Sequence, residues 1–193
     1  MSRFGHECHA LDLVEPQELL RELYENAGIQ YAVGNIEVDD LPYDDDFFDA
    51  VSCCQVMEHI THSPLHPMRE FLRILKPGGV CEIDVPNVVC FRNRSRLLRG
   101  KNITYDYVRH YVNAEPILYK GRSFYLARHN REFTRDELRA IYEVAGFERV
   151  EARFLKSRRH RTGWGKLATP FTALKDCIPS LRKSLIAYGY KPA

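Results

Sequence analysis

The sequence predicts an α/β protein in which strands and helices alternate around a mostly parallel sheet. Residues 50–54 form a short run of small and β-branched side chains after a polar turn, which is typical of a strand buried on both faces. Residues 67–75 place apolar side chains three and four positions apart, which indicates an amphipathic helix. A Lys-Pro-Gly-Gly turn at residues 76–79 ends this helix and leads into a second strand at residues 80–85.

These two strands are expected to end at the same edge of the sheet. A parallel pair joined by a helix crosses over right-handed, so the chain after each strand, at Gln55 and Pro86, opens on one rim. Open α/β sheets bind their ligands at that rim. The pattern therefore predicts a ligand site at the carboxyl ends of the strands.

Two further strands and one helix are predicted before this unit. Residues 7–13 and 29–33 have strand patterns, and residues 16–27 form a helix with Leu19, Leu20 and Leu23 as its inner stripe. Asp12 lies near the end of the first strand, where a carboxylate can accept hydrogen bonds from both ribose hydroxyls of a nucleotide. The alternative for Asp12 is a loop residue or a helix cap.

Five short motifs in this region, in this order and spacing, resemble the class I S-adenosylmethionine-dependent methyltransferases of the broad small-molecule type. They are Gly34-Asn35-Ile36-Glu37, Leu41-Pro42-Tyr43, Phe48-Asp49-Ala50-Val51, Met57-Glu58-His59-Ile60 and Leu75-Lys76-Pro77-Gly78-Gly79. The resemblance implies a Rossmann-like three-layer sandwich with an antiparallel C-terminal hairpin. It also implies methyl transfer from S-adenosylmethionine to a small-molecule acceptor.

The resemblance assigns the cofactor site to residues at three strand ends. They are Asp12, Leu13, Asn35, Ile36, Cys54 and Gln55. The family usually has aspartate at the position of Asn35, where it accepts from the adenine amino group, and the amide oxygen of asparagine can do the same. Ile36 would pack on the adenine, although plain core filling explains an isoleucine equally well.

The chain departs from the family at its N-terminal end. The family's glycine-rich turn, which follows a first strand and holds the methionine end of the cofactor, has no counterpart among the eleven residues before Asp12. In the family's strand order, 3-2-1-4-5-7-6, this strand lies between those at residues 7–13 and 50–54. Either these two strands pair directly, or a gap stays open between them, or the chain is N-terminally truncated, which is the expectation here.

The remaining sequence is predicted to complete a single domain spanning residues 1–193. Residues 88–128 are rich in tyrosine and correspond to the segment that forms a lid over the acceptor in the family. The alternative is a surface segment whose aromatic side chains pack on one another. Residues 135–145 form a helix behind a capping box, and residues 147–154 and 184–190 form the hairpin strands. Residues 155–183 are a basic connection to the last strand.

Catalytic groups are expected to be few, because the cofactor already carries the leaving group. His59 is the candidate general base, since it follows a strand end and titrates near neutrality. Glu58 and His59 can instead brace the loop onto the helix. Tyr125 and His129 are weaker candidates for contact with the acceptor.

Composition sets broader limits. The six cysteines show no spacing typical of a metal site, so no metal is expected, and they are interpreted as buried apolar residues of a cytoplasmic protein. No apolar run is long enough to cross a membrane, and the first residues lack the apolar core of a secretory signal. The net charge of +2 indicates no particular partner.

Residues 153–166 form a basic stretch, interpreted as a solvated loop or as a surface for an anionic acceptor, nucleic acid or membrane. No RNA-binding signature accompanies it. The sequence does not indicate an oligomeric state.

Two other functions compete with methyl transfer. An NAD(P)-dependent Rossmann enzyme would share the ribose-binding acid, but its glycine fingerprint and a Tyr-x-x-x-Lys pair are both absent. A non-catalytic, methyltransferase-like domain would also explain the missing glycine turn.

Overall fold

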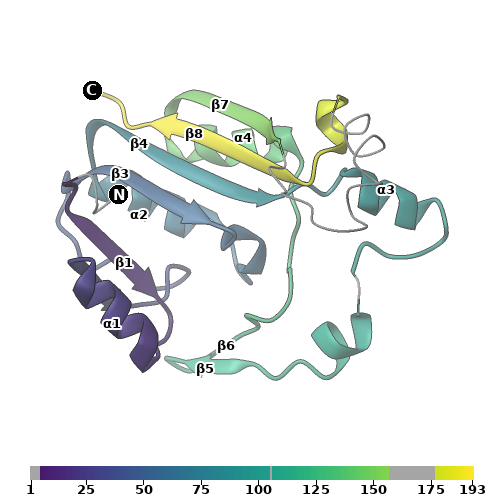
Figure 1. Cartoon of the computed structure of the whole chain (residues 1–193). Coiled ribbons are helices and arrows are strands. Elements are labelled where there is room, and N and C mark those ends of the chain that lie inside the picture. The colour runs from purple at the N-terminus through teal and green to yellow at the C-terminus, as the bar shows by residue number, and fades with distance from the viewer. Residues whose placement is uncertain (1–4, 105, 157–176) are drawn as a thin grey trace.

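The computed structural model describes residues 5–104, 106–156 and 177–193. The chain folds into an α/β arrangement of strands and short helices (Figure 1). Its strands are β1 (Cys8–Asp12), β2 (Ile29–Val33), β3 (Phe48–Cys54), β4 (Leu75–Pro86), β5 (Ile117–Tyr119), β6 (Arg122–Phe124), β7 (Glu148–Leu155) and β8 (Ser184–Tyr190). Its α-helices are α1 (Glu18–Asn26), α2 (Leu65–Ile74), α3 (Phe91–Leu97) and α4 (Arg135–Ala145), and short helical turns occur at η2 (Met57–His59), η3 (Val108–Val112) and η5 (Pro179–Leu181).

The strands form a mixed sheet that remains open. The main sheet has the order β3-β4-β8-β7, with β3 and β4 parallel and the other neighbours antiparallel. A second, two-stranded sheet pairs β1 with β2 in parallel, and β5 and β6 form a small antiparallel ribbon. The predicted α/β class and the C-terminal hairpin of β7 and β8 are confirmed.

Helices α2 and α4 pack together on one face of the main sheet (Figure 1). Tyr142 of α4 is fully buried, and its hydroxyl donates to the carbonyls of Cys81 in β4 and Ala187 in β8, at 3.2 and 3.1 Å. Gly189 of β8 makes room for this ring, because a Cβ there would lie 2.4 Å from Tyr142 Cδ1. The predicted capping box of α4 is present between Thr134 and Glu137.

Strands β1 and β3 do not pair with each other. A groove of about 410 Å³ separates them, lined by side chains from β1 and from most of β3. Of the arrangements that the sequence left open, direct pairing is excluded and the open gap is what the structure shows. The ring of His9 bridges one end of the gap, with edge-on contacts to Tyr43, Phe47 and Phe48 at centroid distances of 5.4, 5.5 and 5.2 Å.

The predicted inner stripe of α1 was wrong. Leu19 is 71% exposed and Leu23 56% exposed, and no residue of α1 is buried. The periodicity predicted the helix correctly, but a sheet of only two strands is too narrow to cover its apolar side. Strand β4 also begins earlier than expected, at Leu75, because the Lys-Pro-Gly-Gly turn joins the sheet through an irregular register with β3.

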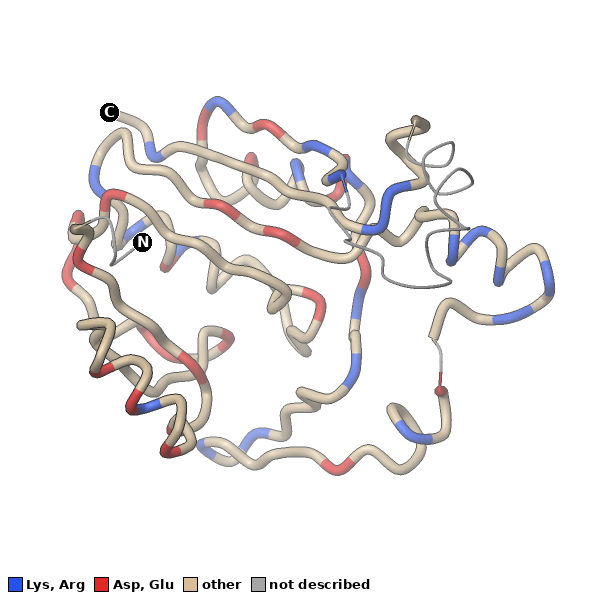
Figure 2. The backbone as a smooth tube through the Cα atoms, in the orientation of Figure 1, with Lys and Arg blue, Asp and Glu red and all other residues tan. Residues whose placement is uncertain are grey.

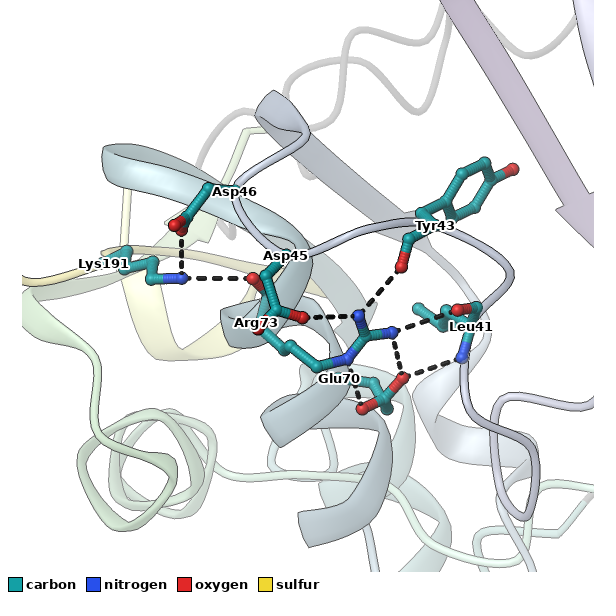
Figure 3. Close-up of polar contacts among 7 residues, drawn as sticks. All are labelled: Leu41, Tyr43, Asp45, Asp46, Glu70, Arg73 and Lys191. Carbon is teal, nitrogen blue, oxygen red and sulfur yellow. Dashed lines mark hydrogen bonds and ion pairs between the residues drawn. The ribbon is translucent and has the colours of Figure 1, made fainter.

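One arginine fixes the connection between the two sheets (Figure 3). Arg73 of α2 donates to both carboxylate oxygens of Glu70, at 2.9 and 2.7 Å, and to the carbonyls of Leu41 and Tyr43, at 3.0 and 2.8 Å. It also reaches Asp45 at 2.9 Å. Glu70 in turn accepts from the backbone N–H of Leu41 at 2.7 Å. The loop that leads from β2 to β3 is thereby tied to helix α2.

Replacing Arg73 with methionine tests this network. Arg73→Met keeps the apolar stem but leaves the largely buried Glu70 carboxylate without its charged partner, so we expect stability to fall by about 2 to 3 kcal/mol. Chemical denaturation would measure the change. Arg139→Met, which removes an exposed pair with Glu143, is the control and should cost less than about 0.5 kcal/mol. Equal effects of the two substitutions would contradict the assignment.

The same network predicts an acid sensitivity. The hydrogen bond from Arg73 holds the pKa of Glu70 below its ordinary value. Its contribution is therefore complete above the unfolded-state pKa, about 4.3, and is lost as the pH falls through the lower folded-state pKa. The difference in melting temperature between the wild type and Glu70→Gln should be constant above about pH 5. It should shrink below that pH, and a difference independent of pH would contradict the shift.

Candidate ligand-binding site

A pocket of about 260 Å³ opens where the carboxyl ends of β1, β2 and β3 converge. It brings together residues from three separate strand ends and from one distant segment. They are Leu11, Asp12, Leu13, Gly34, Asn35, Ile36, Glu37, Gln55, Val56, His59, Ile60 and Leu126. Five of the six predicted cofactor residues and the predicted base therefore line one pocket. The open groove between β1 and β3 shares Leu11, Ile36 and Val56 with it, so the two spaces are neighbours.

Asp12 stands at the last position of β1, beside the start of the loop that follows β2. Its Oδ1 accepts from the backbone N–H of Leu13 at 2.7 Å, which holds the carboxylate at the pocket edge. Its carbonyl accepts from the N–H of Gly34 at 2.9 Å, which joins the two strand ends. The side chain is exposed, as a group that binds a ligand from solvent must be.

Asn35 is buried, with 5% of its surface exposed, and lines the same pocket. Its Oδ1 accepts from the backbone N–H of Glu37 at 2.9 Å, so the oxygen expected to receive the adenine amino group already has a donor. Its Nδ2 is buried and has no hydrogen-bond partner among the described residues. A buried donor without an acceptor is costly, so the pocket wall at Asn35 fits a ligand that carries a ring nitrogen or another acceptor.

Gln55 and Cys54 end up on different sides of the end of β3. Gln55 lines the pocket with a left-handed backbone, φ 54°, and its Nε2 donates to Asp84 of β4 at 2.9 Å. Cys54 lines the neighbouring groove instead. The difference arises because β3 ends at Cys54 and the backbone turns at Gln55.

Glu37 anchors the pocket floor to the chain beyond η2. Its Oε2 accepts from the backbone N–H groups of Thr61 and His62 and from Nδ1 of His62, each at 2.9 Å. The carboxylate is buried, so these charge-assisted bonds determine where the loop lies. Sequence reasoning had used Glu37 only as part of a motif, and the structure gives it a positioning role.

The helical turn η2 carries Glu58 and His59 and is held by a segment about 70 residues away. The backbone N–H of Asn130 donates to the carbonyl of Glu58 at 2.7 Å, and its side chain donates to the carbonyl of His59, also at 2.7 Å. Nδ1 of His59 lies 2.9 Å from the carbonyl of Arg128. The rings of His59 and His129 meet edge to face, with centroids 4.9 Å apart.

The three titratable groups of this cluster are shifted in different directions. Burial raises the pKa of Glu58. Burial also lowers the pKa of His59, although hydrogen bonds to the carbonyls of Arg128 and Leu126 act in the opposite direction. The hydrogen bond to Glu132, Nδ1 to Oε1 at 3.2 Å, raises the pKa of His129. His59 is therefore the histidine held in its neutral form.

A second pocket, of about 410 Å³, includes His129 but not His59 in its lining. It is lined by residues 102–104 and 127–132 together with Arg92, Tyr107, His110 and Tyr111. Of the two predicted acceptor residues, His129 lines this pocket and Tyr125 does not. The Tyr125 ring instead lies against the guanidinium of Arg128, whose Cζ is 3.9 Å from the ring centroid.

Charges are unevenly distributed around these spaces (Figure 2). Arginines and lysines gather on α3 and on the segment that leads to α4, whereas acidic residues lie along β1 and α1. Most of the predicted basic stretch, residues 157–166, lies outside the described residues. Among the described residues, no helix is long and apolar enough to pass through a membrane.

The pocket lies at the ends of parallel strands, with an acid at the end of the first of them, which is where open α/β sheets bind nucleotides. The sequence profile of a family described as "Methyltransferase domain" matches residues 1–83. The chain is 30% identical over 126 residues to a demethylmenaquinone methyltransferase of Staphylococcus carnosus, which covers 59% of this chain and 46% of that protein. It is also 43% identical over 56 residues to a demethylmenaquinone methyltransferase of Clavibacter sepedonicus. That match covers 28% of this chain and 22% of that protein. The chain thus spans less than half the length of the curated relatives it matches.

Among solved structures, the fold is similar to a phosphoethanolamine N-methyltransferase of Haemonchus contortus in complex with S-adenosyl-L-methionine. The TM-score is 0.61 and the identity 16%, over 100% of this chain and 45% of that one. The match of residues 1–83 and these relatives support a class I S-adenosylmethionine-dependent methyltransferase, and the solved structure shows that the fold is shared. The family interpretation made from the five motifs is confirmed.

The role of Glu37 can be tested without a ligand. Glu37→Gln keeps the size of the side chain but replaces a charged acceptor of three bonds with a neutral one, so we expect a loss of about 1 kcal/mol. Backbone amides of residues 59–62 should exchange with solvent faster than in the wild type. Glu22→Gln on the exposed side of α1 is the control. Unchanged exchange in Glu37→Gln would contradict the anchoring role.

Proposed function

We propose that this protein is an S-adenosylmethionine-dependent methyltransferase that acts on a small-molecule acceptor. The carrying observation is the convergence of Asp12, Asn35 and Gln55, from the ends of three parallel strands, on one pocket that also contains His59. Residues scattered along 48 positions of sequence, 12 to 59, come together only because of the strand topology.

The residues present fit the nucleoside part of the cofactor. The Asp12 carboxylate is exposed at the pocket edge, where it can accept from two ribose hydroxyls. The buried Nδ2 of Asn35 lacks an acceptor, and an adenine ring nitrogen supplies one. Ile36 lines the same wall and offers an apolar surface for the base. The neighbouring groove between β1 and β3 offers space for the rest of the cofactor.

S-adenosylmethionine, when bound, supplies a methyl group on a sulfonium, which is already a good leaving group. The protein then has to position the acceptor and remove its proton where the reacting atom is oxygen or nitrogen. His59 suits the second task, because burial keeps it neutral and the Arg128 carbonyl holds its Nδ1, which leaves the lone pair on Nε2.

The acceptor is assigned to the 410 Å³ pocket beside His129. Its tyrosines provide apolar walls, and Arg92, Arg128 and Arg131 favour an acceptor with aromatic or anionic character. Residues 88–128 supply part of these walls, in keeping with a lid over the acceptor. The described cysteines are free, which fits the cytoplasmic location expected from the sequence.

Two alternative functions can be distinguished from methyl transfer by experiment. A non-catalytic domain of the same fold would not bind the cofactor. An NAD(P)-dependent enzyme would use the same acid at the end of β1 for a different nucleotide. Calorimetric titration with S-adenosylhomocysteine and, separately, with NADH distinguishes them. Binding of S-adenosylhomocysteine alone supports the proposal, and binding of NADH alone overturns it.

The Asp12 carboxylate should carry much of this affinity. Asp12→Asn keeps an oxygen for the Leu13 N–H but removes the charge and one acceptor, so we expect S-adenosylhomocysteine to bind about 10- to 100-fold more weakly. Asp40→Asn makes the same charge change at an exposed site outside the pocket and should leave the affinity unchanged. Equal affinities for wild type and Asp12→Asn would contradict the assigned ribose contact.

A further inference from the structure

Glu58, His59 and His129 form a cluster whose chemistry differs from the adenosine pocket. One ligand-capable atom from each lies within 4.8 Å of the other two. Glu58 and His59 are neighbours in η2, whereas His129 arrives from the chain before α4, about 70 residues later. The backbone bonds of Asn130 and Arg131 to the Glu58 carbonyl, at 2.7 and 3.2 Å, hold the two segments together.

The Glu58 carboxylate is placed where an unpaired anion is costly. The residue is 1% exposed, and its Oε2 is buried without a hydrogen-bond partner among the described residues. Neither neighbouring imidazole donates a hydrogen bond to it in the structure. A buried carboxylate oxygen without a donor is normally either protonated or matched by a cation.

The Nδ1 atom of each histidine has an acceptor beside it. Nδ1 of His59 lies 2.9 Å from the Arg128 carbonyl, and Nδ1 of His129 lies 3.2 Å from Glu132 Oε1. Glu132 is itself fixed by Asn93 at 2.7 Å. A carbonyl or carboxylate that accepts from one ring nitrogen sets the tautomer and leaves the lone pair on the other nitrogen, which is the usual outer arrangement around a ligating histidine.

We propose that Glu58, His59 and His129 bind a divalent transition-metal ion, with Zn²⁺ as the ion that suits the set best. Two imidazole nitrogens and one carboxylate oxygen are ligands that Zn²⁺ accepts, and three protein ligands leave a fourth position open. Tetrahedral bonds of about 2.0 to 2.1 Å bring ligand atoms to about 3.4 Å from one another. The ligand atoms would therefore have to approach one another by no more than about 1.4 Å.

The position of the site gives the ion a use beyond stability. His59 lines the adenosine pocket and His129 lines the acceptor pocket, so the ion would lie between the two. Its open position would face a ligand oxygen or nitrogen. Coordination occupies the lone pair that proton transfer would need, so His59 serves either as a metal ligand or as a base. Metal binding itself does not depend on the proposed methyl transfer.

Zinc binding to the full chain, freed of metal with a chelator, tests the proposal. Calorimetry with Zn²⁺ should show one site per chain, and the visible absorption of Co²⁺ in the same protein should be that of a tetrahedral complex. Glu58→Gln, of nearly equal size, should weaken Zn²⁺ binding more than about 100-fold, since even outer-shell changes cost 10- to 100-fold. His129→Gln should do the same. His6→Gln, an exposed histidine outside the cluster, should leave the affinity unchanged.

The melting temperature separates a metal site from a structural role. Without metal, Glu58→Gln should be as stable as the wild type or more so, because an unmatched buried carboxylate has been removed. Zn²⁺ should raise the melting temperature of the wild type and not that of the variant. The proposal is overturned if wild type binds no Zn²⁺, if Glu58→Gln binds it equally well, or if His6→Gln alone abolishes binding.

Discussion

The arrangement of this protein depends on the hydrogen bonds of Arg73. The sheet of β1 and β2 shares no ladder with the main sheet, so backbone pairing does not fix their relative position. The guanidinium of Arg73 and the carboxylate of Glu70 together bind the backbone of residues 41–43, which lead from one sheet to the other. Hydrogen bonds to charged groups contribute about 1.5 to 3 kcal/mol each, more than the exposed ion pairs elsewhere on the molecule. The ends of β1, β2 and β3 can therefore face one pocket although a groove separates two of these strands.

Much of the fold could be predicted from local patterns. The strands at residues 29–33 and 184–190 and the helix at residues 135–145 have the bounds expected from alternation, periodicity and capping. Each of these signals is carried by neighbouring residues, which sequence reasoning sees directly. The helix at residues 18–26 was also predicted, but not its exposure, because burial depends on what the rest of the fold places against a helix.

In the candidate site, too, local patterns predicted some residues, whereas contacts that depend on the fold were missed. Asp12, Asn35 and Gln55 were found because each follows a recognisable strand, and topology brings strand ends together. The hydrogen bond from Glu37 to the Asn35 oxygen could not be found, since it depends on the conformation of a turn. The proximity of Glu58 to His129 is a long-range contact with no spacing to reveal it. The only signal was the Glu-His pair of the motif, which indicated a polar group at the pocket but not its third member.

The central claim is that the ends of β1, β2 and β3 hold the nucleoside of S-adenosylmethionine. A crystal structure of the protein grown with saturating S-adenosylhomocysteine tests it most directly. The account predicts the ribose hydroxyls at about 2.7 Å from the Asp12 carboxylate, with the adenine against Ile36 and a ring nitrogen accepting from Asn35 Nδ2. Density for the nucleoside at any other place on the protein, with Asp12 left to solvent, would contradict it.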